Sequence, residues 1–245
     1  MTEKKLREFI DVYEKYYYDD NNDDEKQRGK TELGVSIIHP TSRNNEDEIM
    51  NYLRRGKQNI NTINWKMGGT VSKDGIRTQY YDYPIDNING FCEEIEKLDF
   101  SEYNMESLSE INIISLYDDI LKIIKEVDLV GYGSVYIINS MFFLSKGNIP
   151  IYDYYANVAV KALLYDKCPQ DIFVGQAPGK EEHARGCKER KLAVNMLLEY
   201  MALLKELANN TCYFMPKGEG YISRKLDRAL WVYGHATEKW KINTK

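Results

Sequence analysis

The sequence predicts a mainly α-helical protein. Apolar residues recur at helical spacing along most of the chain, patterns typical of strands are few, and there is no internal repeat. The 245 residues suffice for one large domain or two small lobes. Hydrophobic residues make up 43% and charged residues 29% of the chain, which is an ordinary globular balance.

Capping residues, glycines, prolines or polar runs mark the ends of the expected helices. The first, over 3–18, places Leu6, Phe9 and Ile10 on one face. The acidic run 19–24 ends it, and we interpret this run as a solvated loop because it lacks the spacing and turn glycine of a calcium loop. The other expected elements are helices over 46–66, 86–98, 106–126, 134–145 and about 181–208, a helix beginning at Asp153, a last helix from near Ser223 to Gly234, a loop or short hairpin over 70–84 and a Pro/Gly-containing loop over 166–180.

Composition and charge exclude several classes of protein. The apolar runs are too short to span a bilayer, and the N-terminus has no signal-peptide core, so we expect a cytoplasmic protein without a membrane partner. Four widely spaced cysteines predict reduced thiols. The net charge of −5 argues against a protein that coats nucleic acid through bulk positive charge, although a local basic stripe would still bind phosphate.

A glycine turn between two apolar helices is the first informative motif. Residues 129–134 read Leu-Val-Gly-Tyr-Gly-Ser, and two glycines allow a sharp turn. The amides at the start of the following helix would point outward with a positive dipole end, which suits a phosphate independently of base sequence. Ser134 is the expected N-cap. An ordinary helix–turn–helix joint explains the turn alone equally well.

An aspartate follows nineteen residues after Ser134, in the segment Pro150-Ile-Tyr-Asp153. Pro150 precedes a helix start, so Asp153 is expected at the helix cap or first position. A plain capping role would explain Asp153 by itself. A carboxylate held there is also suited to stabilising the positive charge that develops on a sugar when its bond to a base breaks.

Together the hairpin, the apolar helix, the short loop and the aspartate resemble the helix-hairpin-helix DNA glycosylase superfamily over about residues 106–165. The resemblance implies one unit over 1–245, in which the helices of 1–100 and 180–245 complete two helical lobes with the active-site cleft between them. It implies that Asp153 is the catalytic residue and that the base is flipped out of the duplex. It also implies a DNA-binding monomer.

The resemblance further implies a monofunctional glycosylase, which leaves an abasic site. Lyase members carry a lysine just after the second glycine of the hairpin, where this chain has Ser134. No iron–sulfur cluster is expected, because four closely spaced C-terminal cysteines are missing. No cofactor is implied other than a monovalent cation at the hairpin. The family acts on oxidised, alkylated and mismatched bases, and includes antiphage enzymes that excise glucosylated hydroxymethylcytosine, so repair and phage defence both stay open.

Candidate site residues follow from proximity and from the family pattern. The base pocket is expected to include Tyr152, Tyr154, Tyr155, Asn139 and, from the last helix, Asp227 and Trp231. The DNA-binding residues are expected to be Gly131, Tyr132, Gly133, Ser134, Trp65, Lys66 and Arg224. His235 could also contact a flipped base, although its place after Gly234 is more typical of a helix end.

The sequence leaves two rival interpretations open and argues against two others. A non-catalytic helix-hairpin-helix module would bind DNA without using Asp153, and a helical interaction protein would bind no DNA. The segment 175–181 resembles a phosphate loop but is one residue short and has Glu181 where a magnesium-binding hydroxyl is needed. His183 and Cys187, with Cys168 and Cys212, match no standard zinc spacing, so no metal site is expected.

Overall fold

The computed structural model confirms the mainly helical class. It describes residues 1–17, 24, 32–34, 50–53, 55–57, 70–71, 77–78, 85–98, 110–129, 133–175, 177, 187–208 and 224–240. Within these residues the strands are β1 (Thr70–Val71) and β2 (Arg77–Thr78), which pair antiparallel inside the segment 70–84, expected as a loop or short hairpin.

The helices begin and end within a few residues of their expected bounds. In chain order they are α1 Glu3–Tyr13, the 3₁₀ turn η1 Glu14–Tyr16, α5 Ile85–Ile95, α6 Glu110–Glu126, α7 Ser134–Leu144, α8 Tyr154–Leu164, the 3₁₀ turn η2 Pro169–Asp171, α10 Cys187–Ala208 and α11 Arg224–Gly234. The helix expected over 46–66 lies largely outside the described residues, of which 50–53 and 55 are helical.

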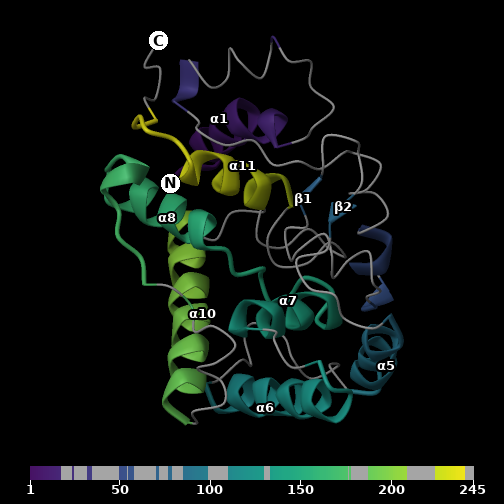
Figure 1. The fold of residues 1–245 in the computed structure, drawn as a ribbon. Helices are drawn as coiled ribbons and strands as arrows, with labels where there is room; N and C mark the ends of the chain where they lie inside the picture. The colour runs from purple at the N-terminus through teal and green to yellow at the C-terminus, as the bar shows by residue number, and fades with distance from the viewer. Residues whose placement is uncertain are drawn as a thin grey trace.

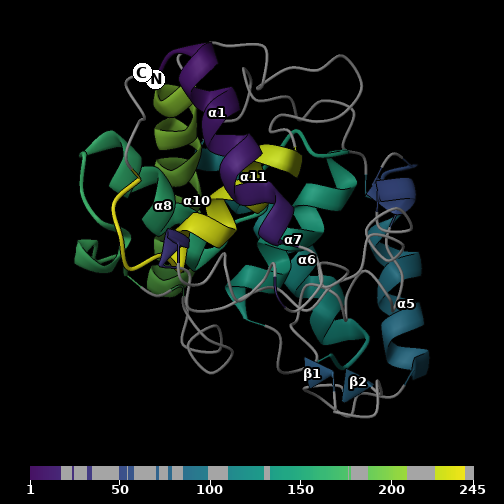
Figure 2. The same cartoon turned by 90° about the horizontal axis from the view of Figure 1, so that it is seen from above.

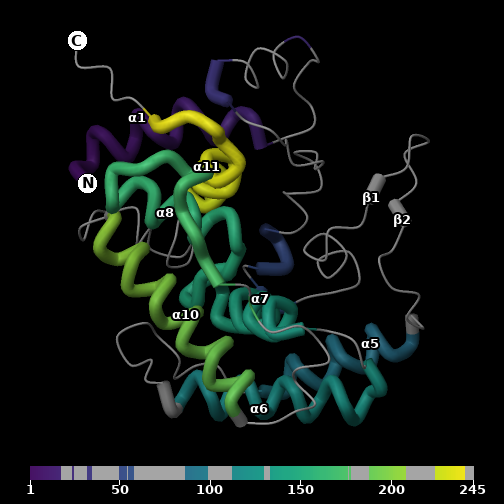
Figure 3. Tube along the Cα trace, turned by 60° about the vertical axis from the view of Figure 1, so that its left-hand side comes forward, coloured from purple at the N-terminus to yellow at the C-terminus, as the bar shows by residue number. Residues whose placement is uncertain are grey.

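The helix α10 connects two groups of helices. One group consists of α1, α8 and α11, and the other consists of α5, α6 and α7. Figure 1 shows α10 running from α8 and α11 at one end to α6 at the other, with α7 beside it. Seen from above, α11 lies between α1 and α8, so the first and last described helices are neighbours (Figure 2). The β1–β2 pair lies on the same side of the molecule as α5, above it in the view, and away from α8 (Figure 3).

One apolar core runs through both groups of helices. It combines buried residues of α1, α5, α6, α7, α8, α10 and α11. The helix α7 is central, since all of its residues except Val135 are buried. A smaller cluster of Leu53, Phe142, Phe143 and Ile151 packs on the other side of α7. The segment that leads to Asp153 is therefore anchored on apolar packing through Ile151 and Tyr152.

A largely buried ion pair joins α11 to η1, the turn that follows α1. The guanidinium of Arg228 lies 2.6 Å from the carboxylate of Glu14, and the two side chains are 8% and 17% exposed. Removing either side chain would take this counter-charge away from the other, largely buried charge, which would lower the stability of the protein. The C-terminal end of α11 in turn lies against Tyr155 at the start of α8.

Candidate functional site

Asp153 caps α8, as the sequence predicts. Its backbone is extended, with φ −134° and ψ 137°, and its Oδ1 accepts hydrogen bonds from the amides of Tyr155 at 2.9 Å and Ala156 at 3.3 Å. Pro150 and the buried pair Ile151 and Tyr152 lead into this position. The two amide donors and the buried residues that precede Asp153 hold its carboxylate in one orientation. The carboxylate lies at the partly exposed start of the helix.

The C-terminal end of α11 touches the start of α8 at Gly234. A Cβ at Gly234 would lie 2.6 Å from the carbonyl carbon and 2.9 Å from the Cα of Tyr155, and would overlap the Tyr155 carbonyl oxygen. Only a residue without a side chain allows this approach. Gly234 therefore sets the distance between α11 and the segment that carries Asp153.

An aromatic stack is assembled at this contact. The rings of Tyr155 and His235 are stacked, with centroids 3.5 Å apart and planes 26° apart. Trp231 lies 4.2 Å from the His235 ring and 6.4 Å from the Tyr155 ring, between centroids. Tyr154 meets Tyr155 edge-on at 5.2 Å. The structure thus brings Tyr154, Tyr155 and Trp231, three of the residues expected in the base pocket, together with His235.

His235 is buried and is held as the neutral ring with a defined tautomer. Its Nδ1 lies 2.9 Å from the carbonyl oxygen of Trp231, and a carbonyl can only accept, so Nδ1 carries the proton. Burial lowers the pKa of His235 below its ordinary value of 6.5, and the hydrogen bond to Trp231 and the charge of Asp153 oppose that shift in part. The carboxylate of Asp153 accepts the amide of Tyr155, so it lies next to the residue that carries one ring of the stack.

The lowered pKa of His235 predicts a pH-dependent stability. Because the unfolded chain binds a proton below pH 6.5 more readily than the folded one, the stabilising contribution is complete above pH 6.5. It is lost as the pH falls through the folded-state pKa. We expect the free energy of unfolding to fall more between pH 7.5 and pH 5 for the wild type than for His235→Phe, which keeps a ring but cannot titrate. Urea unfolding at both pH values measures this, and equal losses in the two proteins would contradict it.

Tyr152, expected in the base pocket, lies in the core behind Asp153. It is 1% exposed, and its hydroxyl accepts a hydrogen bond from the Nδ2 of Asn157 at 3.3 Å. Its ring meets the fully buried ring of Tyr200 edge-on, at 5.6 Å between centroids. Burial raises the pKa of Tyr200, and the negative charges of Asp227 and Asp153 raise it further. Both carboxylates therefore lie within electrostatic reach of Tyr200.

Asp227 and Arg224 form a buried ion pair, with side chains 8% and 7% exposed. The other guanidinium nitrogen of Arg224 donates to the hydroxyl of Tyr17 at 3.3 Å. Arg224 therefore does not present its charge on the surface, against the expectation of a phosphate contact, because its pairing with Asp227 and Tyr17 draws it inward. Lys225, the next residue, is exposed. Asp227 is likewise committed to this pair rather than exposed to a base.

The glycine turn is described only at its end. Val130, Gly131 and Tyr132 lie outside the described residues, as do Trp65 and Lys66. Gly133 is the N-cap of α7, with φ −84°, ψ 179° and no side-chain capping bond. The expectation that Ser134 is the N-cap is wrong: Ser134 is the first residue of the helix and is fully buried, where its hydroxyl bonds the phenol of Tyr117. That bond also removes the Ser134 hydroxyl from the expected DNA contacts.

Asn139 and two further residues carry buried polar atoms without partners. Both amide atoms of Asn139, the Oδ1 of Asn157 and the hydroxyl of Tyr200 have no hydrogen-bond partner among the described residues. Asn139 was expected in the pocket and lies 3% exposed within α7. Sequence reasoning missed Asn157 and Tyr200. Asn157 had a detectable signal, since it follows Asp153 by one helical turn, whereas nothing in the sequence of α10 distinguishes Tyr200.

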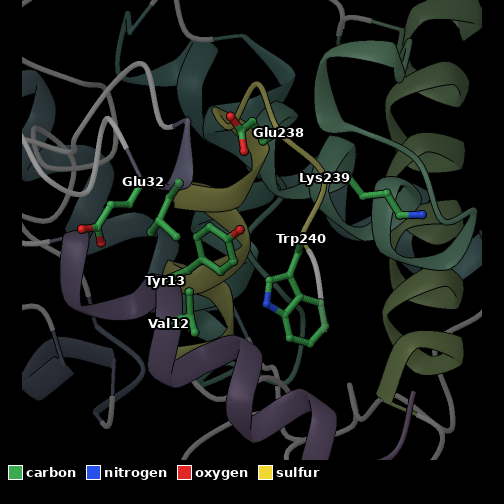
Figure 4. A pocket seen from close by; sticks show the side chains of 7 residues that line it. Val12, Tyr13, Glu32, Glu238, Lys239 and Trp240 are labelled. Carbon is green, nitrogen blue, oxygen red and sulfur yellow. The ribbon is translucent and has the colours of Figure 1, made fainter. Parts of the chain in front are cut away.

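A pocket of about 260 Å³ lies elsewhere, between the end of α1 and the segment that follows α11. Its lining residues are Val12, Tyr13, Glu32, Leu33, Glu238, Lys239 and Trp240. Figure 4 shows Tyr13 and Trp240 in the middle of the group, with the amine of Lys239 directed away from them. That amine lies 2.5 Å from the carboxylate of Asp166. None of the expected site residues lines this pocket.

Comparisons of the chain with protein-family models, curated proteins and solved structures returned no match. Among the described helices, none is long and apolar enough to cross a membrane.

Proposed function

We propose that this protein is a monofunctional DNA glycosylase of the helix-hairpin-helix type, with Asp153 as its catalytic carboxylate. The observation that supports the proposal best is the junction of α8 and α11. There a carboxylate oriented by two backbone amides stands beside a stack of aromatic rings. A base-excising enzyme needs both features, an anion for the sugar and flat surfaces for the base.

The chemistry would proceed by hydrolysis. As the bond between the base nitrogen and the anomeric carbon breaks, its electron pair leaves with the base and positive charge grows on the sugar. The carboxylate of Asp153 stabilises that charge and accepts a proton from the attacking water. The water oxygen bonds to the anomeric carbon, which leaves an abasic site, and the departing base takes up a proton. The step needs no cofactor.

The aromatic stack would receive the flipped base. Tyr155 is 37% exposed, whereas His235, on which its ring stacks, is buried, so Tyr155 is the member of this pair that a base would meet. Base stacking on an aromatic ring contributes roughly 1–3 kcal/mol and tolerates many bases. This tolerance fits an enzyme whose selectivity depends on other contacts.

Base release is the direct test of this function. The purified protein is incubated with separate DNAs that carry oxidised, alkylated, mismatched or glucosylated hydroxymethylated bases, and free bases are identified by mass spectrometry. We expect one class to be released and abasic sites to appear without strand cleavage. Release from glucosylated phage DNA alone would assign the protein to phage defence. No release from any of these DNAs, with intact binding, would contradict the glycosylase proposal.

A non-catalytic DNA-binding module is the alternative. It is favoured by the glycine turn that ends at Gly133, the N-cap of α7, because a hairpin of this kind can contact the DNA backbone without a catalytic carboxylate. Such a module would bind DNA with an affinity that falls with salt, would release no base, and would be indifferent to substitution of Asp153.

A further inference from the structure

Two buried polar atoms belong to residues that contact Tyr152, the residue before Asp153. Tyr200, on α10, is fully buried, and its hydroxyl has no hydrogen-bond partner among the described residues. Asn157, on α8, is 2% exposed, and its Oδ1 has none in that part of the chain either. Buried polar groups without partners are costly and uncommon, and ordered water often satisfies them.

Both residues contact the same tyrosine, the one that precedes Asp153. The Nδ2 of Asn157 donates to the Tyr152 hydroxyl at 3.3 Å, and the Tyr200 ring meets the Tyr152 ring edge-on. Asn157 also donates its backbone amide to the carbonyl oxygen of Asp153 at 3.0 Å. Burial and the charges of Asp227 and Asp153 raise the pKa of Tyr200, so its hydroxyl keeps its proton and remains a donor.

We propose that Tyr200 and Asn157 hold an internal water molecule beside Tyr152, and that Tyr200 is thereby a positioning residue for Asp153. A water accepts a hydrogen bond from the Tyr200 hydroxyl and donates one to the Asn157 oxygen, which satisfies both groups. The water and the two rings keep the backbone of Tyr152 and Asp153 in place. This inference rests on the proposed glycosylase function, in which small displacements of the carboxylate slow the reaction.

Substitution Tyr200→Phe tests the positioning role, because it removes one hydroxyl and keeps the ring that packs on Tyr152. We expect kcat for base release to fall about 10-fold or more, with KM unchanged. We expect Tm to stay within about 2 °C of the wild type, since the lost hydroxyl has no protein partner. A merely structural role would lower Tm and leave kcat alone.

Tyr233→Phe is the matched control. Tyr233 is 1% exposed, and its hydroxyl accepts a hydrogen bond from the backbone amide of Trp240 at 3.1 Å. Removing a hydroxyl that has a protein partner should lower Tm and leave kcat unchanged, which is the opposite of the result expected for Tyr200→Phe. The two variants therefore separate positioning from stability.

The outcomes separate the inference from the function on which it rests. Absence of base release by the wild-type protein would overturn the glycosylase function and the positioning role with it. An active wild type with an unchanged kcat in Tyr200→Phe would overturn the positioning role alone. A high-resolution crystal structure decides the water site independently: we expect ordered water within hydrogen-bond distance of the Tyr200 hydroxyl and the Asn157 oxygen, and its absence would overturn that site.

Discussion

We expect Asp153→Asn to reduce the rate of base release about a thousandfold while DNA binding persists. The amide of asparagine cannot supply the negative charge that stabilises the sugar cation, nor accept a proton from water. Asparagine still caps a helix well, so its oxygen can keep the bonds to the amides of Tyr155 and Ala156. Single-turnover release and the salt dependence of DNA affinity measure the two properties separately.

The control for this variant is Asp11→Asn, which removes the same charge from an exposed position on α1. It should release bases at the wild-type rate. Unfolding of Asp153→Asn in urea should change by less than about 1 kcal/mol, because the cap is retained. If Asp153→Asn released bases normally, the carboxylate would be a helix cap and no more, and the assignment of the active site would fail.

Gly234→Ala is expected to destabilise the protein by at least about 2 kcal/mol. Propensity alone favours alanine in a helix by roughly 0.5–1 kcal/mol, so the expected sign is opposite to the local preference. The new Cβ would meet backbone atoms of Tyr155, at 2.6 Å from its carbonyl carbon, and backbone cannot rotate away. Relief requires α11 to move from the start of α8, which displaces the His235 ring and the segment of Asp153.

The control here is Gly175→Ala. A Cβ at Gly175 would have no atom within 4 Å, and this residue is exposed, so the free energy of unfolding should change by no more than about 0.5 kcal/mol. Urea unfolding of both variants provides the comparison. We also expect Gly234→Ala to lose base release under conditions where it stays folded. Equal stability of the two variants would show that α8 and α11 do not meet as closely as described.

Helix positions were predictable because the information is local. Apolar spacing locates α1 and α6, and glycine at position 234 marks the end of α11. The cap at Asp153 follows from a short motif in which Pro150 precedes the helix start, so it too was predicted and is confirmed. The glycosylase family stays a prediction, since it rests on the same local motif.

Long-range partners were not predictable from the sequence. A charged residue at a helix start is normally exposed, yet Arg224 turns inward. It pairs with the carboxylate of Asp227 and donates a hydrogen bond to the hydroxyl of Tyr17, which lies near the N-terminus of the chain. Ser134 has the chemistry of an N-cap, yet the phenol of Tyr117 binds its hydroxyl and Gly133 takes the cap position. In each case a tertiary contact outweighs a local preference.

By itself the sequence determined the helical class, the approximate bounds of the helices and the capping role of Asp153, because these depend on neighbours within a few turns of chain. Only the tertiary structure decided that His235 stacks on Tyr155 and that Tyr200 lies behind Tyr152. Those contacts join segments far apart in the chain. A polar or aromatic side chain has the same local pattern whether it faces water or another helix, so only the packing of α8, α10 and α11 settles which it does.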